Sequence, residues 1–315
     1  MTTPIKNTFE DEISKFPTKT QADLRQALAK RGVIPAELVA ACLDELQVDI
    51  GTFMIQLLPI AATYARVPIS GFHVGAVALG MPPASHIAGP GSLYLGANME
   101  FPAEALSFSV HGEQSATNNA WLSGEVGLQS IAINAAPCGY CRQFLYELTT
   151  ATKGFNILLK VNEDPNDCSY TIQPLTYYLP DAFGPQNLGV KERLMAPEAH
   201  DLKISATDAT AQEALASANA SYSPYTKNYS GVALKDADGL IFTGRYAENA
   251  AYNPSMSPLG SALAFMNMSL PAQAELAITD AVLVEGRSDI SQKKVTEVVL
   301  SSISPDVSLQ YYQAS

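Results

Sequence analysis

The chain has 315 residues, of which 47% are hydrophobic and 16% charged, and its formal net charge is −12. This length allows two ordinary domains, and the composition argues against intrinsic disorder. The acidic balance and the lack of any Lys and Arg cluster argue against a nucleic-acid partner, so we expect a neutral or cationic small molecule.

The N-terminal segment 1–17 has no apolar run, so we expect neither a signal peptide nor a transit peptide there. The most apolar stretch, 53–65, is shorter than the roughly 20 residues that a membrane-spanning helix needs. Four cysteines do not make a disulfide framework in a chain of this size. We therefore expect no membrane partner, a reducing compartment and a cytoplasmic location.

Helical spacing of apolar residues dominates the N-terminal part of the chain. Three helices are expected, at 18–31, 35–46 and 53–64. Thr20 is expected to cap the first helix, Gly32 to end it, and Pro59 to kink the third. Residues 1–50 are interpreted as a small helical cap.

After Gly71 the pattern changes to strands and helices in alternation. Strands are expected at 72–79, 93–95, 131–134 and 155–161, and helices at 104–123 and 139–148. The loop 81–91 is too long for a tight hairpin. This order implies an α/β/α layered domain with helices packed on a mixed sheet, which we place at 51–189.

The chain then repeats itself after a linker. G-A-V-A-L at 75–79 returns as S-G-V-A-L at 230–234, and G-A-N-M-E at 96–100 returns as G-R-Y-A-E at 244–248. A strand, a helix and a strand follow in the same order, at 281–285, 291–302 and 307–312. We interpret 190–315 as a second copy of the domain, and the fold class as α/β with two tandem domains.

The second copy is predicted to have lost its chemistry. Counted in register from Glu100 and Glu248, His111 becomes Leu259 and Glu113 becomes Ser261. Beyond position 200 the chain contains no cysteine and no histidine. The second copy is therefore degenerate and cannot hold a transition metal through such ligands.

The segment 111–141 contains the residues with the clearest chemistry. His111, Cys138 and Cys141 provide one imidazole and two thiolates, a set that suits zinc, and Glu113 is available for the metal's water. Structural zinc sites are closed by four protein ligands, whereas the two remaining cysteines belong to no motif. Three ligands leave an open position, so we expect one catalytic Zn²⁺ per chain.

We expect His111 and Glu113 in the exposed turn that begins one helix, and the two cysteines at the start of the next, so that both helix N-termini face the metal. Arg142 is expected to draw electron density from the sulfur atoms. Zinc lowers the pKa of bound water to about 7, and Glu113 can pass the proton to a ring nitrogen and then to a leaving amine. Attack of that hydroxide on a carbon that bears an amino group is hydrolytic deamination.

These motifs together resemble the cytidine deaminase family, and in particular its duplicated, two-domain, homodimeric branch. The resemblance spans nearly the whole chain, through N-M-E at 98–100, H-G-E-Q-S-A at 111–116, A-W-L-S-G at 120–124, P-C-G-Y-C-R-Q at 137–143 and L-P-D-A-F-G-P at 179–185. It implies zinc-dependent conversion of cytidine or deoxycytidine and water into uridine or deoxyuridine and ammonia, with attack at C4, in pyrimidine salvage.

By motif match, Asn98 and Glu100 are expected to bind the ribose 3′-hydroxyl, and Phe72 and Phe183 to contact the pyrimidine. The backbone of Gly112, together with the Glu113 carboxylate, is expected to read the base edge.

Two other functions stay open. A deaminase of another nucleoside or of a nucleotide is disfavoured because Glu100 would repel a nearby phosphate. A zinc-stabilised, non-catalytic scaffold is disfavoured because the zinc motifs of the first copy are intact. The second copy is expected to support assembly, with its loop 246–254 near an active site of the partner chain.

Overall fold

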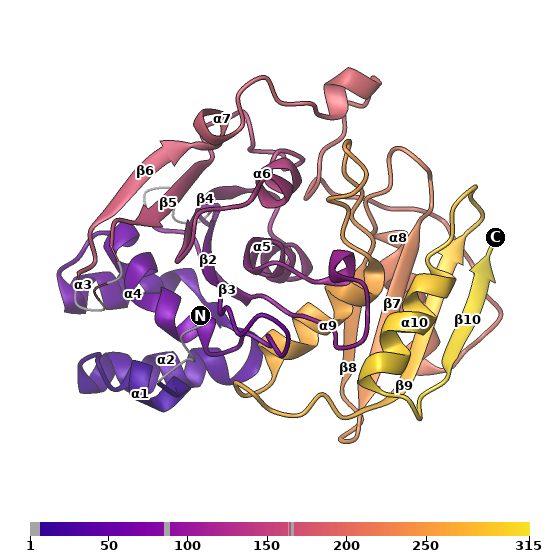
Figure 1. Cartoon of the computed structure of the whole chain (residues 1–315), viewed down its shortest axis with the longest axis horizontal. Coiled ribbons are helices and arrows are strands. Elements are labelled where there is room, and N and C mark those ends of the chain that lie inside the picture. Colours follow the sequence, from indigo (N-terminus) through magenta and orange to yellow (C-terminus); the bar gives the residue numbers. More distant parts are fainter. Residues whose placement is uncertain (1–6, 85–88, 163, 165–166) are drawn as a thin grey trace.

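Two mixed sheets form the framework of the chain (Figure 1). The computed structural model describes residues 7–84, 89–162, 164 and 167–315. The first sheet has the strand order β1-β3-β2-β4-β5-β6, with β1 Val33–Ile34, β2 Gly75–Gly80, β3 Leu93–Ala97, β4 Leu128–Ile133, β5 Asn156–Lys160 and β6 Tyr170–Pro174. The second has the order β10-β9-β7-β8, with β7 Ser230–Asp236, β8 Ile241–Arg245, β9 Ile278–Gly286 and β10 Leu309–Ala314.

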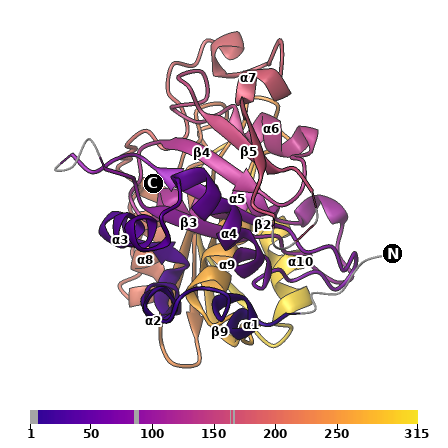
Figure 2. The same cartoon turned by 90° about the vertical axis from the view of Figure 1, so that its left-hand side faces the viewer.

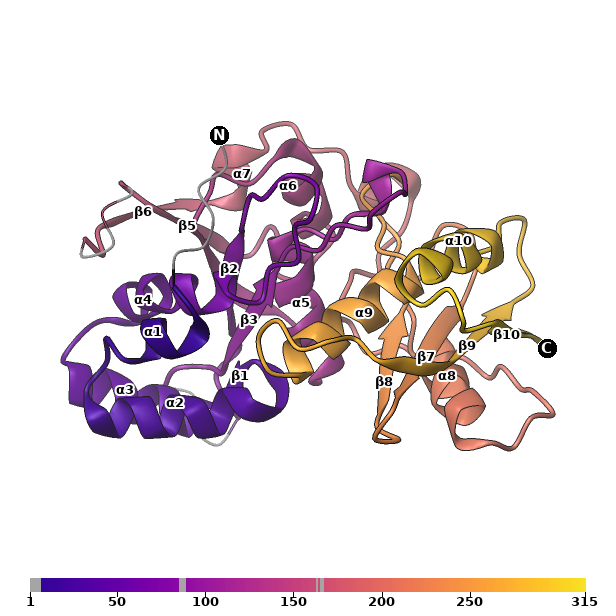
Figure 3. The same ribbon diagram turned by 60° about the horizontal axis from the view of Figure 1, so that its bottom comes forward.

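The helices lie in layers on these sheets. They are α1 Phe9–Ile13, α2 Thr18–Arg31, α3 Ala36–Leu46, α4 Ile50–Ala62, α5 Gly112–Leu122, α6 Gly139–Leu145, α7 Leu175–Tyr178, α8 Ala209–Asn219, α9 Pro258–Ser269 and α10 Lys293–Ile303. Helices α5 and α9 contact each other between the two sheets, while α4 and α8 cover the outer faces (Figures 1 and 3). A single apolar core therefore joins the two copies across the α5–α9 contact.

The internal repeat is confirmed by the topology. In each copy the first strand pairs antiparallel with the second and third strands, and the third pairs parallel with the fourth, so β3-β2-β4-β5 matches β8-β7-β9-β10. Each first strand also has a register shift at its C-terminal end, at Leu79/Gly80 and at Lys235/Asp236. Equivalent irregularities at equivalent positions indicate one ancestral unit rather than two unrelated α/β domains.

The N-terminal region contributes to the first sheet as well as covering it (Figure 2). Strand β1 pairs antiparallel with the edge strand β3. Helix α2 ends at Gly32, whose φ is 58°, and the Asn119 side chain of α5 donates hydrogen bonds to the carbonyl oxygens of Arg31, Gly32 and Leu95. The bond to Arg31 satisfies a carbonyl group at the helix end, and the other two join α5 to the Gly32 turn and to strand β3.

Alternation along β2 explains why this strand can be buried on both faces. Ala76 and Ala78 face the core shared with α5, whereas Val77 and Leu79 face the core beneath α4. Because Ala76 and Ala78 have small side chains, helix α5, whose N-cap is the candidate metal ligand His111, lies close to the sheet. Strands covered on both faces read as continuous apolar runs, as G-A-V-A-L does.

The ends of the N-terminal helices test the capping predictions. Helix α2 has the predicted span, but the cap at Thr20 was wrong, because Pro17 precedes the helix and Thr20 is buried within it. Helix α4 begins at Ile50, before the predicted start, because the Asp49 side chain accepts a hydrogen bond from the Thr52 amide.

The helix predicted at 104–123 was also wrong in its first half. Val110 pairs with Met99 in an antiparallel bridge, so the backbone is extended just before His111 and α5 starts at Gly112. The preceding stretch contains only a short 3₁₀ turn at Leu106–Phe108. The prediction missed β6, α7 and α8, and part of the predicted loop 81–91, at 85–88, lies outside the described residues. Within the described part of the chain, no helix combines the length and apolar character needed to cross a bilayer.

Candidate active site

Three side chains predicted to bind a metal converge at one point. Nδ1 of His111 lies 3.6 Å from Sγ of Cys138 and 3.2 Å from Sγ of Cys141, and the two sulfur atoms are 3.6 Å apart. Among the described residues this is the one group of His, Cys, Asp and Glu ligand atoms close enough together to hold a metal ion. The other two cysteines, buried Cys42 and partly buried Cys168, are not part of it.

The spacing of these donors fits zinc. With Zn–S bonds of about 2.3 Å and Zn–N bonds of about 2.0 Å, a tetrahedral centre separates its sulfurs by about 3.8 Å and sulfur from nitrogen by about 3.5 Å. The observed separations of 3.2–3.6 Å are near these values. The three donors are therefore spaced as three ligands of a bound Zn²⁺ would be, and such a centre would have a further position for water or substrate.

Two helix N-termini supply the ligands, as predicted. His111 is the N-cap of α5 and Cys138 the N-cap of α6, and Cys141 lies in the first turn of α6. Hydrogen bonds with Cys141 and His111 lower the pKa of the Cys138 thiol to about 3, whereas the bond with Cys138 and burial raise the pKa of the Cys141 thiol. The prediction for Arg142 was wrong: its guanidinium donates to the carbonyl oxygens of Pro137 and Tyr178.

Glu113 lies close to the three candidate ligands but is not part of their cluster. It lies in the first turn of α5, is 4% exposed and lines the same pocket as His111 and Cys138. Burial raises the pKa of this carboxyl group above its usual range. A raised pKa brings a carboxyl group nearer to the value at which it can both take up and release a proton near neutral pH.

A pocket of about 400 Å³ opens over this centre. Its volume falls within the range of small-molecule sites. Four of the five residues predicted to contact substrate line it, namely Phe72, Asn98, Glu100 and Gly112. The fifth, Phe183, does not line it; its side chain is 45% exposed and its carbonyl oxygen accepts a hydrogen bond from Gln143 of α6.

Glu100 also organises the backbone at the pocket edge. Its carboxylate accepts hydrogen bonds from the Ser70 hydroxyl, at 2.5 Å, and from the amides of Ile69 and Ser70. Burial opposes ionisation of Glu100, but these bonds outweigh it and lower the pKa. In the second copy Glu248 accepts the equivalent bonds from the Tyr225 and Thr226 amides and from the Thr226 hydroxyl.

Comparison with known proteins shows the ancestry of this site. Residues 51–155 and residues 175–297 each match a model described as the cytidine and deoxycytidylate deaminase zinc-binding region. A cytidine deaminase from Photobacterium profundum is 47% identical over 261 residues, which is 82% of each chain, and one from Aliivibrio fischeri is 38% identical over 98% of this chain and 99% of its own. The chain belongs to the cytidine deaminase family.

A solved structure matches part of this chain. A variant cytidine deaminase from Mycobacterium tuberculosis is 26% identical, with a TM-score of 0.34, and 99% of it aligns with 44% of this chain.

The structure corrects the register of the second copy. Val110 pairs with Met99 before α5, and Met256 pairs with Ala247 before α9, so the equivalent of His111 is Ser257, the N-cap of α9. The equivalent of Glu113 is then Leu259, not Ser261. The sequence register was displaced because the loop before α9 is two residues shorter than the loop before α5.

Buried hydrogen bonds surround the N-terminus of α10 in the second copy. Gln292 is the N-cap of α10, as Cys138 is of α6. Its backbone amide donates to the Glu285 carboxylate, and its side-chain nitrogen donates to the Asn228 side-chain oxygen. Glu285 also accepts from Asn228, Ser291 and Tyr311. In the second copy of this deaminase, the helix start that corresponds to that of α6 therefore lies in a packed polar cluster.

Several residues of the deaminase site were not predicted from the sequence. Ser70 lines the pocket and bonds to Glu100, and Asn134 holds the pocket wall through the Gly75 amide and the His73 carbonyl. Gln114 accepts a hydrogen bond from the His111 amide, at 3.1 Å. A glutamine at the third position of the helix, which can bond back to the N-cap amide, was the available signal for Gln114.

Proposed function

We propose that this chain catalyses the zinc-dependent hydrolytic deamination of cytidine and deoxycytidine to uridine and deoxyuridine, with release of ammonia. One observation carries the proposal: the His111, Cys138 and Cys141 cluster lies at a pocket of about 400 Å³ that is lined by His111, Cys138 and the buried Glu113. Membership of the cytidine deaminase family supports it.

The protein supplies ligands, a proton carrier and substrate contacts. His111, Cys138 and Cys141 would hold Zn²⁺, which when bound supplies a Lewis acid that activates water near neutral pH. Glu113 accepts a proton from the attacking water and delivers it to ring nitrogen N3 of the cytosine. A second proton transfer through Glu113 to the amino group at C4 allows ammonia to leave and the C4 carbonyl to form.

Substrate contacts are assigned from the pocket lining. Asn98 and Glu100 would bind the ribose 3′-hydroxyl, because a carboxylate that accepts three hydrogen bonds keeps lone-pair capacity for a fourth. Phe72 is 54% exposed at the pocket, where an aromatic ring can cover the pyrimidine. The buried Gly112 backbone and Glu113 would read the base edge.

The substrate assignment is tested with cytidine, deoxycytidine, their monophosphates and adenosine, each with and without a chelator. The loss of cytosine absorbance reports turnover. Cytidine and deoxycytidine should be consumed and the chelator should stop the reaction. Preference for a monophosphate or for adenosine would favour the nucleotide or other-nucleoside alternative, and no turnover by zinc-loaded protein would favour the scaffold.

We propose further that the protein is a homodimer in which Phe183 acts on the partner's pocket. Phe183 is exposed and absent from the pocket of its own chain. The second copy would support the dimer. Within one chain, the Asn249 side chain donates to the Gln143 carbonyl oxygen and the Ala250 amide donates to the Glu147 carboxylate. The neighbouring Tyr252 side chain is 62% exposed. These contacts tie the loop 246–254 to its own α6 and to the turn that follows α6, and leave Tyr252 exposed toward a partner.

Subunit mixing tests this arrangement. Glu113→Gln chains lack the proton carrier, and Phe183→Ala chains lack the aromatic ring. If Phe183 acts across the dimer, mixed dimers contain one intact site and the mixture should regain about a quarter of wild-type turnover. No recovery in dimers shown to be mixed would place Phe183 in its own chain's site. A fragment 1–189 that is monomeric and fully active would refute the need for the second copy.

The domain bounds, cellular location and metabolic role complete the proposal. We propose three parts for the chain, a helical region at 1–50, a catalytic domain at 51–189 and a degenerate domain at 190–315. Four cysteines without disulfides suit the cytoplasm, and the reaction would serve pyrimidine salvage.

A further inference from the structure

Tyr140 lies between Cys138 and Cys141 in the sequence, and its ring stacks on the imidazole of His111. Its ring centroid is 5.1 Å from that of the His111 imidazole, and the two planes are 24° apart. Nδ1 of His111 faces the sulfur atoms, and no hydrogen bond to its Nε2 is found among the described residues. A metal-bound histidine usually donates its second N–H to an acceptor that fixes the ring. Here the tyrosine face limits rotation of the imidazole instead.

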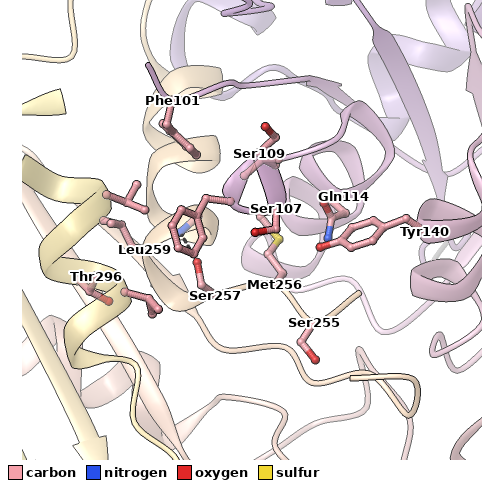
Figure 4. A pocket seen from close by; sticks show the side chains of 15 residues that line it. Phe101, Ser107, Ser109, Gln114, Tyr140, Ser255, Met256, Ser257, Leu259 and Thr296 are labelled. Carbon is pink, nitrogen blue, oxygen red and sulfur yellow. Dashed lines mark hydrogen bonds between the residues drawn. The ribbon is translucent and has the colours of Figure 1, made fainter. Parts of the chain in front are cut away.

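Gln114 joins His111 to the second copy of the domain. Its side-chain oxygen accepts from the His111 amide, at 3.1 Å, and its nitrogen donates to the Pro254 carbonyl, at 3.3 Å. Gln114 is 1% exposed, so losing either partner would leave a buried polar group unpaired. Its amide nitrogen also lies beside the Tyr140 hydroxyl (Figure 4).

The second copy is hydrogen-bonded to helices α5 and α6 near Pro254. Asn249 donates to the Gln143 carbonyl of α6, at 2.9 Å, and Asn118 of α5 exchanges hydrogen bonds with Ser261 of α9. The two helices that carry the zinc ligands are therefore both bonded to the degenerate domain. These bonds limit movement of the segment that contains Pro254. The hydrogen bond from Gln114 to the Pro254 carbonyl can therefore position the start of α5.

We infer that Tyr140 and Gln114 are positioning residues, which hold the His111 imidazole in its ligating orientation and transmit that constraint from the degenerate domain. The inference rests on the proposed zinc-dependent function. It gives the second copy a role within its own chain, in addition to assembly. Neither side chain would touch the nucleoside, because neither lines the 400 Å³ pocket.

Tyr140 can be changed without breaking a packed core. Together with Gln114 it lines a separate cavity of about 120 Å³ between the two copies, beside Ser255 and Met256 (Figure 4). Tyr140→Leu removes the stacked ring, whereas Tyr140→Phe keeps the ring and removes only the hydroxyl. Tyr177→Leu is the matched control, because Tyr177 is 65% exposed and its ring packs edge-on against that of Tyr178, away from the metal ligands.

The readout is the rate at which zinc passes from the loaded enzyme to an excess of a coloured chelator. Tyr140→Leu should release zinc roughly 10- to 100-fold faster, the range for lost outer-shell support. Tyr140→Phe should stay within about threefold of the wild type, because the stack remains. The kcat for cytidine should fall in Tyr140→Leu while KM stays nearly constant, since only the centre is disturbed.

Release from Tyr140→Leu at the wild-type rate would overturn the inference, as would equal acceleration in Tyr177→Leu. A raised KM with unchanged kcat would make Tyr140 a substrate contact instead. If Tyr140→Leu does not fold, Gln114→Met decides: release several-fold faster supports the link, and an unchanged rate refutes it. Failure of the wild type to deaminate cytidine would refute the proposed function, while the zinc-release comparison would still test the positioning.

Discussion

Gly96 lies where strand β3 passes closest to helix α5, so a single methyl group there should move the catalytic helix. A Cβ on Gly96 would be 2.0 Å from the Ala116 nitrogen and 2.5 Å from its Cα. Non-bonded heavy atoms need roughly 3.5 Å, so Gly96→Ala must displace α5 by more than about 1 Å. We expect a loss of about 1–3 kcal/mol in the free energy of unfolding, as for other overpacked cores.

The same displacement should reduce catalysis. The start of α5 carries Glu113 and its N-cap is His111, so the whole centre would move relative to Cys138 and Cys141. A misplacement of about 1 Å can reduce turnover roughly 100-fold. We therefore expect a fall of that order in kcat per bound zinc for Gly96→Ala.

The internal repeat provides a matched control. A Cβ on Gly244 would be 2.1 Å from the Ala262 nitrogen of α9, so Gly244→Ala creates the same clash against a helix without metal ligands. Stability should fall by a similar amount, but the loss in kcat per bound zinc should be at least about tenfold smaller, because α5 is disturbed only indirectly.

Urea unfolding, zinc content and the initial rate of cytidine loss would be measured on both variants and the wild type. A Gly96→Ala enzyme with unchanged stability and turnover would refute the close-packing argument. Equal losses of turnover in the two variants would show that damage to the shared core, not displacement of the ligand helix, limits catalysis.

Three further predictions concern the site. Glu113→Gln should keep its fold and zinc but lose at least about 100-fold in turnover, measured against metal content; retention of more than a tenth of the rate would contradict the proton-carrier role. Metal analysis should find about one zinc per chain, and His111→Ala should lose zinc and activity together; two equivalents would show that the second copy also binds metal. Glu100→Gln should raise KM for cytidine more than it lowers kcat, and free cytosine as a better wild-type substrate would contradict the ribose contact. The pKa of Glu100 is lower in the folded state than in the unfolded state. The stabilisation from ionised Glu100 is therefore fully present above the unfolded pKa of about 4.3 and is lost as the pH falls through the folded pKa. If the difference in unfolding free energy between wild type and Glu100→Gln stayed constant on acidification, this prediction would be contradicted.

Local spacing was sufficient to predict which three side chains form the His–Cys–Cys cluster. His111 and Glu113 lie two residues apart at one helix start, and Cys138 and Cys141 lie within one turn at another, so each pair is placed by its own helix. The repeat was equally visible, because strands buried on both faces keep apolar sequences even where catalysis is lost. Such features depend on residues close together in the chain.

Long-range contacts decided what the sequence could not. The bridge between Met99 and Val110 sets where α5 begins, and the equivalent bridge between Ala247 and Met256 corrects the register of the second copy. Loop length does not reveal such pairings, because a shortened loop changes the count of residues without moving the helix.

The roles of individual side chains at the site also depend on distant partners. Arg142 follows a ligand in sequence, yet it bonds to backbone carbonyl groups and not to sulfur. Phe183 belongs to a matching motif, yet it lies outside its own chain's pocket. The bond from Gln114 to Pro254 joins residues 140 positions apart. The sequence by itself determined which atoms can bind the metal, whereas tertiary packing alone determined what orients them, because a side chain bonds to whatever the folded chain brings within reach.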